Sequence, residues 1–132
     1  MLGKIVLSVA ALLFITYGLV SFFFPAIPAG NAGLVMSDGN AFAEIGAMYG
    51  GLQTGIGLFC LLAVMKSKFY HAGLTFLVLG VGALALGRLY STLTAIDPVS
   101  VYTYGALGYE IGTAILALVA LRESNKKTLD LL

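Results

Sequence analysis

Apolar residues along the chain form four long stretches, separated by short polar or glycine- and proline-rich segments. The stretches cover residues 5–24, 43–65, 72–93 and 99–121. Twenty helical residues rise about 30 Å, which is the thickness of the hydrocarbon core of a bilayer. Strands with unpaired edges would leave backbone polar groups unsatisfied in lipid, so helices are the economical way to cross it. The pattern predicts an all-α integral membrane four-helix bundle, formed as a single transmembrane domain over residues 1–132.

The composition excludes a water-soluble globule. Hydrophobic residues make up 60% of the 132 positions, charged residues only 10%, and mean hydropathy is +1.01, whereas a soluble domain has about 25% charged residues. The net charge of +1, without a basic cluster interleaved with aromatic residues, argues against nucleic-acid binding. Cys60 is the only cysteine, so an intrachain disulfide and a cysteine-rich metal site are excluded. No phosphate loop, nucleophile elbow or metal-ligand pair appears, so we expect a non-enzymatic protein without catalytic residues, metal or cofactor.

The positions of the basic residues predict the orientation in the membrane. Six of the seven flank the apolar stretches on one side: Lys4, Lys66, Lys68, Arg122, Lys126 and Lys127. The loops on the other side, residues 25–42 and 94–98, contain acids but neither Lys nor Arg. By the positive-inside rule, both termini are cytoplasmic, and we expect a multi-pass protein of the bacterial cytoplasmic membrane. The first stretch is too long for a signal-peptide core of about 7 to 15 residues, so we expect it to stay as an anchor.

Several helix ends have local support in the sequence. Asp38 or Asn40 can cap the second helix, and Asp97 followed by Pro98 predicts the start of the fourth. The polar tail from Glu123 to Leu132 is expected to fray.

Small residues are placed where helices can approach each other closely. Seventeen glycines fall mostly inside the predicted helices, and close van der Waals contact is a main source of helix association in lipid. At 100° per residue the second helix has one stripe of Gly46, Gly50, Gln53 and Gly57 and a nearly opposite stripe of Glu44, Gly51 and Gly55. We expect this helix to contact partners on two sides, either within one bundle or, as the alternative, across a homo-oligomer seam.

Three ionisable residues fall inside the predicted spans: Glu44, Arg88 and Glu110. Each costs about 2.5 to 3.5 kcal/mol at the centre of a bilayer, so each needs a partner or water. Arg88 lies about five residues, roughly 8 Å, below the outer end of its helix, between the shallower Glu44 and the deeper Glu110. We therefore expect the three to converge in the outer half. The surplus negative charge of such a group can be relieved by protonation, most readily of Glu110, by water, or by a ligand that is cationic or donates hydrogen bonds.

This charge group supports three hypotheses for function. The leading one is a protein that binds a small amphipathic ligand or a lipid in an outward-facing polar pocket. Arg88 would hold an anionic or carbonyl group, the two acids would orient Arg88, and Tyr49, Gln53 and Tyr90 would line the pocket. The second is a structural or accessory subunit of a membrane complex whose ion pair only fixes helix packing. The third is a proton-linked transporter, which would need a polar route on the inner side.

Two residues of reactive types, the single histidine and the single cysteine, are expected to have no catalytic or metal-binding role. His71, the only histidine, lies beside Phe69 and Tyr70 at the predicted inner interface and is typical of an interfacial belt. Cys60 lies among apolar residues and is expected to be an inert core thiol.

Short motifs in the second, third and fourth helices resemble a known family. They are the run LALGRLYS at residues 84–91, Asp97-Pro98 and the helix with Glu110, together with Glu44, YGGL at residues 49–52 and GxGL at residues 55–58. The chain resembles the small bacterial membrane proteins grouped as domain of unknown function 4345. The resemblance covers most of the chain and implies a four-helix inner-membrane protein with no established activity. Small four-helix glutathione-handling membrane enzymes carry a cytoplasm-facing cluster of Arg, Asn and Glu, which has no equivalent here.

Overall fold

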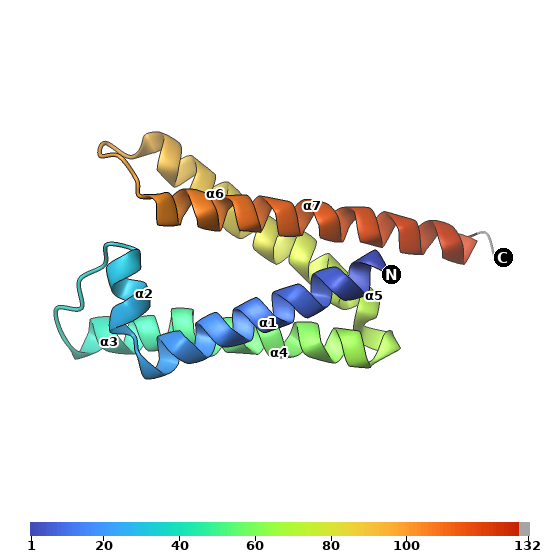
Figure 1. Cartoon of the computed structure of the whole chain (residues 1–132), viewed down its shortest axis with the longest axis horizontal. Coiled ribbons are helices and arrows are strands. Elements are labelled where there is room, and N and C mark those ends of the chain that lie inside the picture. Colours follow the sequence, from blue (N-terminus) through green and yellow to red (C-terminus); the bar gives the residue numbers. More distant parts are fainter. Residues whose placement is uncertain (130–132) are drawn as a thin grey trace. The chain divides into compact units, whose positions relative to one another are not determined.

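The computed structural model describes residues 1–129, and every regular element in that range is helical (Figure 1). The elements are α1 (Leu2–Phe23), α2 (Ala26–Asn31), α3 (Gly39–Ile45), η1 (Gly46–Gly51), α4 (Leu52–Met65), α5 (Ser67–Phe76), η2 (Leu77–Val81), α6 (Gly82–Thr94) and α7 (Val101–Leu129). Four helical runs are long and apolar enough to cross a membrane: Leu2–Phe23, Gly39–Met65, Ser67–Thr94 and Val101–Lys126. The prediction of an all-α chain with four such helices is confirmed, and these helices indicate a membrane protein.

Helix α3 begins at a cap that the sequence predicts. The backbone N–H of Ala41 donates a hydrogen bond to the Asp38 side chain at 3.0 Å. This bond satisfies one of the N–H groups that the first turn of a helix leaves without a helical partner. The short helix α2, in the segment between the first two spans, was not predicted.

Two predicted helix ends are wrong. Asp97 and Pro98 lie outside α7, which begins three residues after the proline, at Val101. The first turn closes there because the N–H of Thr103 donates to the carbonyl of Ser100 at 3.1 Å, and serine is a residue that helix starts prefer.

The tail does not fray at Glu123, since α7 continues to Leu129. No Gly or Pro interrupts this segment, and Glu123 precedes lysines at helical spacing. Residues 130–132 of the tail lie outside the described range.

The second and third spans each contain a π-helical segment that the apolar pattern did not predict. These segments are η1 (Gly46–Gly51) and η2 (Leu77–Val81). A π turn takes in an extra residue, which rotates the following helix by about 100° relative to uniform counting. Residues before and after each π-helical segment therefore do not share the helix faces that a constant 3.6-residue period assigns to them.

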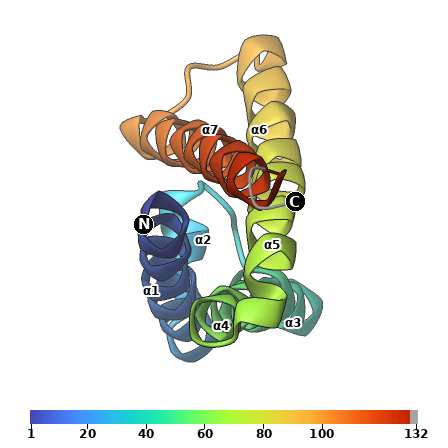
Figure 2. The same cartoon turned by 90° about the vertical axis from the view of Figure 1, so that its right-hand side faces the viewer.

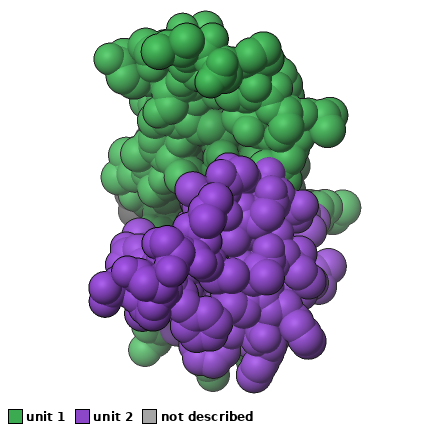
Figure 3. Space-filling model, turned by 90° about the vertical axis from the view of Figure 1, so that its left-hand side faces the viewer, with its two compact units in different colours: residues 1–7, 63–132 green, residues 8–62 purple. Residues whose placement is uncertain are grey.

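The described chain divides into two compact units (Figure 3). Unit 1 comprises residues 1–7 and 63–132, and unit 2 comprises residues 8–62. The expectation of a single domain over residues 1–132 stays a prediction.

In unit 2, α1 runs antiparallel to η1 and α4 at close distance. A Cβ added to Gly57 would lie 2.6 Å from Cγ1 of Ile15, and one added to Gly50 would lie 3.0 Å from Cα of Phe22. The absence of a side chain at these two glycines is thus what lets the backbones approach. The predicted stripe of Gly46, Gly50, Gln53 and Gly57 is confirmed as a packing face at Gly50 and Gly57, whereas a Cβ at Gly46 would meet no atom within 4 Å.

The opposite stripe of the second span is exposed. Gly51 and Gly55 are both exposed, and a Cβ at Gly55 would meet no atom within 4 Å. The expectation that both stripes make contacts is therefore met on one side within the described residues, and a homo-oligomer seam on the other side stays a prediction.

In unit 1, α7 contacts α5, η2 and α6 and runs in the opposite direction to them (Figure 1). It crosses this run of helix at an angle (Figure 2). Near the middle, a Cβ at Gly82 would be 3.7 Å from Cβ of Ala114, so two small residues face each other there. At the end where α5 begins, Oγ of Ser124 lies 3.0 Å from Nε2 of His71. This antiparallel pairing brings the C-terminal part of α6 next to the first turns of α7.

Candidate functional site

Arg88 on α6 and Glu110 on α7 form an ion pair in unit 1. Arg88 Nη2 donates to Glu110 Oε1 at 2.8 Å, and Nε lies 3.0 Å from Oε1 and 2.9 Å from Oε2. The side of the guanidinium therefore meets both carboxylate oxygens, a geometry that is stronger than a single contact. The predicted meeting of these two residues is confirmed.

The two partners differ in burial. The Glu110 side chain is 5% exposed, whereas the Arg88 side chain is 27% exposed. The acid is thus enclosed by the helices, while part of the Arg88 side chain remains accessible. Both oxygens of Glu110 accept hydrogen bonds from Arg88, and the expected relief of surplus charge by protonation, water or a ligand stays a prediction.

Small residues allow this pair to form between helices. Gly82 and Ala114 face each other about one to two turns from the ion pair, and Ala85 and Ala117 are buried nearby in the sequence. With little side-chain volume between α6 and α7, the short Glu110 side chain can reach the guanidinium. Thr113, one turn after Glu110, is also buried.

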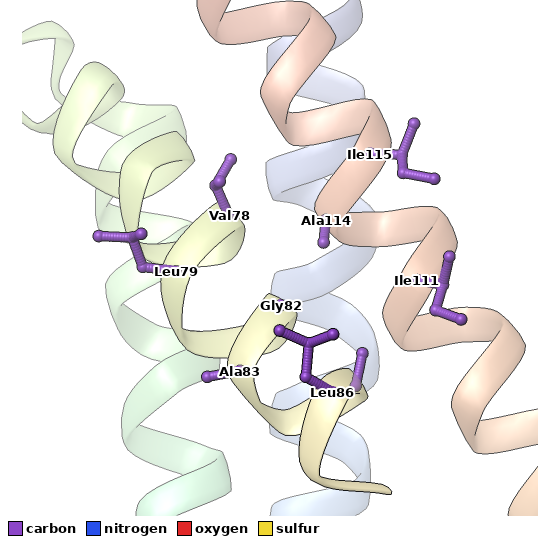
Figure 4. A pocket seen from close by; sticks show the side chains of 9 residues that line it. Val78, Leu79, Gly82, Ala83, Leu86, Ile111, Ala114 and Ile115 are labelled. Carbon is purple, nitrogen blue, oxygen red and sulfur yellow. The ribbon is translucent and has the colours of Figure 1, made fainter. Parts of the chain in front are cut away.

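An apolar groove of about 460 Å³ lies between η2–α6 and α7 (Figure 4). Its lining residues are Val78, Leu79, Gly82, Ala83, Ala85, Leu86, Ile111, Ala114 and Ile115. The stretch from Val78 to Leu86 corresponds to about 12 Å of helix, and the groove is shallow and largely open. It was not predicted, although the small residues at positions 82, 83, 85 and 114 between larger apolar ones are the signal that could have indicated it.

The groove lies next to the ion pair along both helices. Ala85 precedes Arg88 by one turn of α6, while Ile111 follows Glu110 directly and Ala114 lies one turn later on α7. A partly exposed cation and an apolar groove are therefore neighbouring features of the same helix pair.

The other predicted site residues lie elsewhere. Tyr90, on α6, is 71% exposed. Glu44 in α3 is exposed, Tyr49 in η1 and Gln53 in α4 are half-buried, and all three belong to unit 2. Their convergence with Arg88 stays a prediction, and none of the four residues lines the apolar groove.

Two further residues had been expected to be inert. Cys60 is fully buried, as predicted for a core thiol. His71 makes a polar contact with Ser124 across α5 and α7 and packs edge-to-face with Tyr70 at a ring-centroid distance of 5.5 Å. The His71–Ser124 contact was missed because the two residues are 53 positions apart in the sequence. Within residues 1–129, no three His, Cys, Asp or Glu side chains are grouped to hold a metal ion.

A family model described as a domain of unknown function, DUF4345, matches residues 2–121. The chain belongs to the DUF4345 family. The match includes Arg88, Glu110 and every residue that lines the groove, so the whole candidate site of this DUF4345 protein lies in the family region. Neither the curated proteins nor the solved structures that were compared with this DUF4345 chain contain a match.

Proposed function

We propose that this DUF4345 protein binds a membrane lipid or a similar amphipathic molecule, with the polar part of the ligand at Arg88 and an apolar chain in the groove. The observation that carries the proposal is the partly exposed Arg88 side chain beside an apolar groove on the same two helices. Glu110 holds the guanidinium in place through both carboxylate oxygens. A ligand that is polar at one end and apolar along its length matches this order of features.

The charge of the pair favours a ligand group that accepts hydrogen bonds without adding charge. Arg88 and Glu110 together are formally neutral, so an anionic ligand would leave one unbalanced negative charge in a region of low dielectric constant. An ester carbonyl can accept from the guanidinium without that penalty. Arg88 lies six residues before the end of α6, or about 9 Å along the helix, a depth that suits the ester region of a lipid more than its headgroup.

The proposed topology places both termini in the cytoplasm of a bacterial cell and the ion pair in the outer half of the membrane. The support is the separation of the basic residues, which flank α1, α5 and α7 at one end, from the loops at residues 25–42 and 94–98, which lack them. In this arrangement Glu44, Tyr49, Gln53 and Tyr90 belong to the outer half as well. Cysteines introduced at Ser37 and Ser100 should react with an impermeant maleimide in intact cells, and one at Ser67 should not. The opposite pattern would reverse the topology.

The proposal is tested with a lipid that carries a photoreactive group in its acyl chain. We expect cross-links to residues 78–86 and 111–115 in the wild-type protein and a loss of at least tenfold in Arg88→Leu. Ala83→Phe, which fills the groove and leaves the ion pair in place, should reduce the same cross-links. Leu93→Ala is the control, because it changes an exposed apolar side chain of α6 that does not line the groove. Equal labelling in all three variants, or labelling spread evenly over the exposed apolar faces, would reject the proposal.

A structural role of the ion pair in an accessory subunit is the second candidate. It is favoured by one observation, the 5% exposure of Glu110 with both oxygens paired. Under that role Arg88→Met lowers thermal stability in detergent and leaves the lipid cross-links unchanged.

A further inference from the structure

Basic side chains gather at one end of unit 1, away from the ion pair. We define this basic end by five residues whose side chains are all exposed: Lys4, Lys66, Lys68, Arg122 and Lys126. They come from the start of α1, the junction before and the first turn of α5, and the last part of α7. Three helix ends that are distant in the sequence thus contribute positive charge.

Contacts inside unit 1 show that these helix ends lie together. Ser124 Oγ lies 3.0 Å from His71 Nε2, which joins the end of α7 to the start of α5. A Cβ at Gly3 would overlap the Tyr70 hydroxyl and lie 3.1 Å from a methyl of Leu74, which joins the start of α1 to α5. The helix ends that carry the five basic residues therefore lie together at one end of unit 1.

The charge at this surface is not balanced by nearby acids of the described residues. Among residues 1–129, Glu123 is the one acid on these helix ends, against five basic side chains. Glu110 lies more than three turns away along α7 and is paired with Arg88, and Asp97 follows α6 at the opposite end of the unit. Side chains at this surface therefore face a local excess of positive charge.

The polar and aromatic residues at the same place suit the boundary between lipid tails and headgroups. Tyr70 packs its ring beside His71, and the Lys68 ammonium lies 4.8 Å from the centre of the Phe69 ring. Aromatic rings of this kind concentrate at membrane interfaces, and long basic side chains extend from there into the headgroup layer.

We propose that the basic end binds the phosphate headgroup of an anionic membrane lipid, with cations from α1, α5 and α7 around the phosphate. Clusters of Lys and Arg at the edge of membrane helices attract anionic lipids, and the attraction is screened by salt. The inference does not rest on the proposed function, since it concerns other residues at the other end of unit 1.

The test measures binding of phosphatidylglycerol to the full chain in a neutral detergent, with native mass spectrometry to count bound lipids. Phosphatidylglycerol binds at least tenfold more tightly than phosphatidylcholine, and this preference falls as salt is raised. The triple variant Lys66→Gln, Lys68→Gln, Arg122→Gln loses the preference, because each charge removed lowers the affinity for the anionic lipid by about fivefold. The matched variant Lys66→Arg, Lys68→Arg, Arg122→Lys keeps every charge and keeps the preference. Failure here and failure of the proposed function are distinguishable, because this test varies residues of the basic end and the cross-linking test follows residues 78–86 and 111–115.

Four results would overturn the inference. They are equal binding of the two lipids by the wild-type protein, an undiminished preference in the neutral triple variant, a lost preference in the charge-conserving variant, and displacement of the lipid by millimolar inorganic phosphate. The last result would show a site for the free ion rather than for a lipid. If the neutral variant fails to fold, the wild-type protein still tests the inference, through its preference between the two lipids and the salt dependence of that preference.

Discussion

At the scale of single residues, the ion pair between Arg88 and Glu110 is the feature that distinguishes this chain from a set of apolar helices. Glu110 is almost fully enclosed and depends on Arg88 for both of its oxygens. A buried ion pair contributes little net stability compared with apolar residues, yet breaking it from one side is costly because a charge is left unpaired. The pair therefore constrains which single substitutions the helices tolerate.

Removing one charge should destabilise the protein more than removing both. We expect Arg88→Met to lower the free energy of unfolding by about 3 kcal/mol, because the Glu110 carboxylate is then buried without a cation. Arg88→Met combined with Glu110→Leu should recover most of that loss. Unfolding titrations in mixed micelles of the wild type, the single variants and the double variant give the coupling energy. If the double variant loses the sum of the single losses, the two side chains do not stabilise each other.

At the scale of helices, the sequence predicted those features that depend on an uninterrupted local pattern. The four apolar stretches predicted four helices, and the Asp38 cap depends on neighbours only three residues apart. Features that depend on distant residues or on a change of period were missed. These are the groove, which needs α6 and α7 together, the His71–Ser124 contact, and the π-helical segments, which local hydropathy does not indicate. The start of α7 was missed because Pro98 and Ser100 are both plausible at a helix start.

The packing of α1 on α4 can be tested at two glycines of the same helix. Gly57→Ala should destabilise the protein by about 1 to 3 kcal/mol, because the new Cβ would lie 2.6 Å from Ile15 Cγ1 and 2.7 Å from its backbone nitrogen. Gly55→Ala is the matched control. This residue is exposed and has no neighbouring atom within 4 Å of an added Cβ, so the change should be neutral or raise stability by up to about 1 kcal/mol, through the better helix propensity of alanine. Thermal unfolding in detergent measures both, and equal effects would contradict the close approach of α1 and α4.

At the scale of the whole molecule, the charges divide unit 1 into two polar regions with apolar helix between them. The region at Arg88 and Glu110 is formally neutral and has an apolar groove beside it, whereas the basic end carries an excess of positive charge. Their chemistry differs accordingly. The first region suits an uncharged hydrogen-bond acceptor with an apolar chain, and the second suits an anionic headgroup. The two proposals therefore concern different lipid groups and are tested independently.

The most direct measurement for the proposed function is a high-resolution density map of the protein purified with its native lipids. We predict elongated density along the groove between Val78 and Leu86 on one side and Ile111 and Ile115 on the other, ending in a polar group within hydrogen-bond distance of the Arg88 guanidinium. A map with an empty or closed groove, and with Arg88 in contact only with protein, would contradict ligand binding and leave the ion pair a structural role.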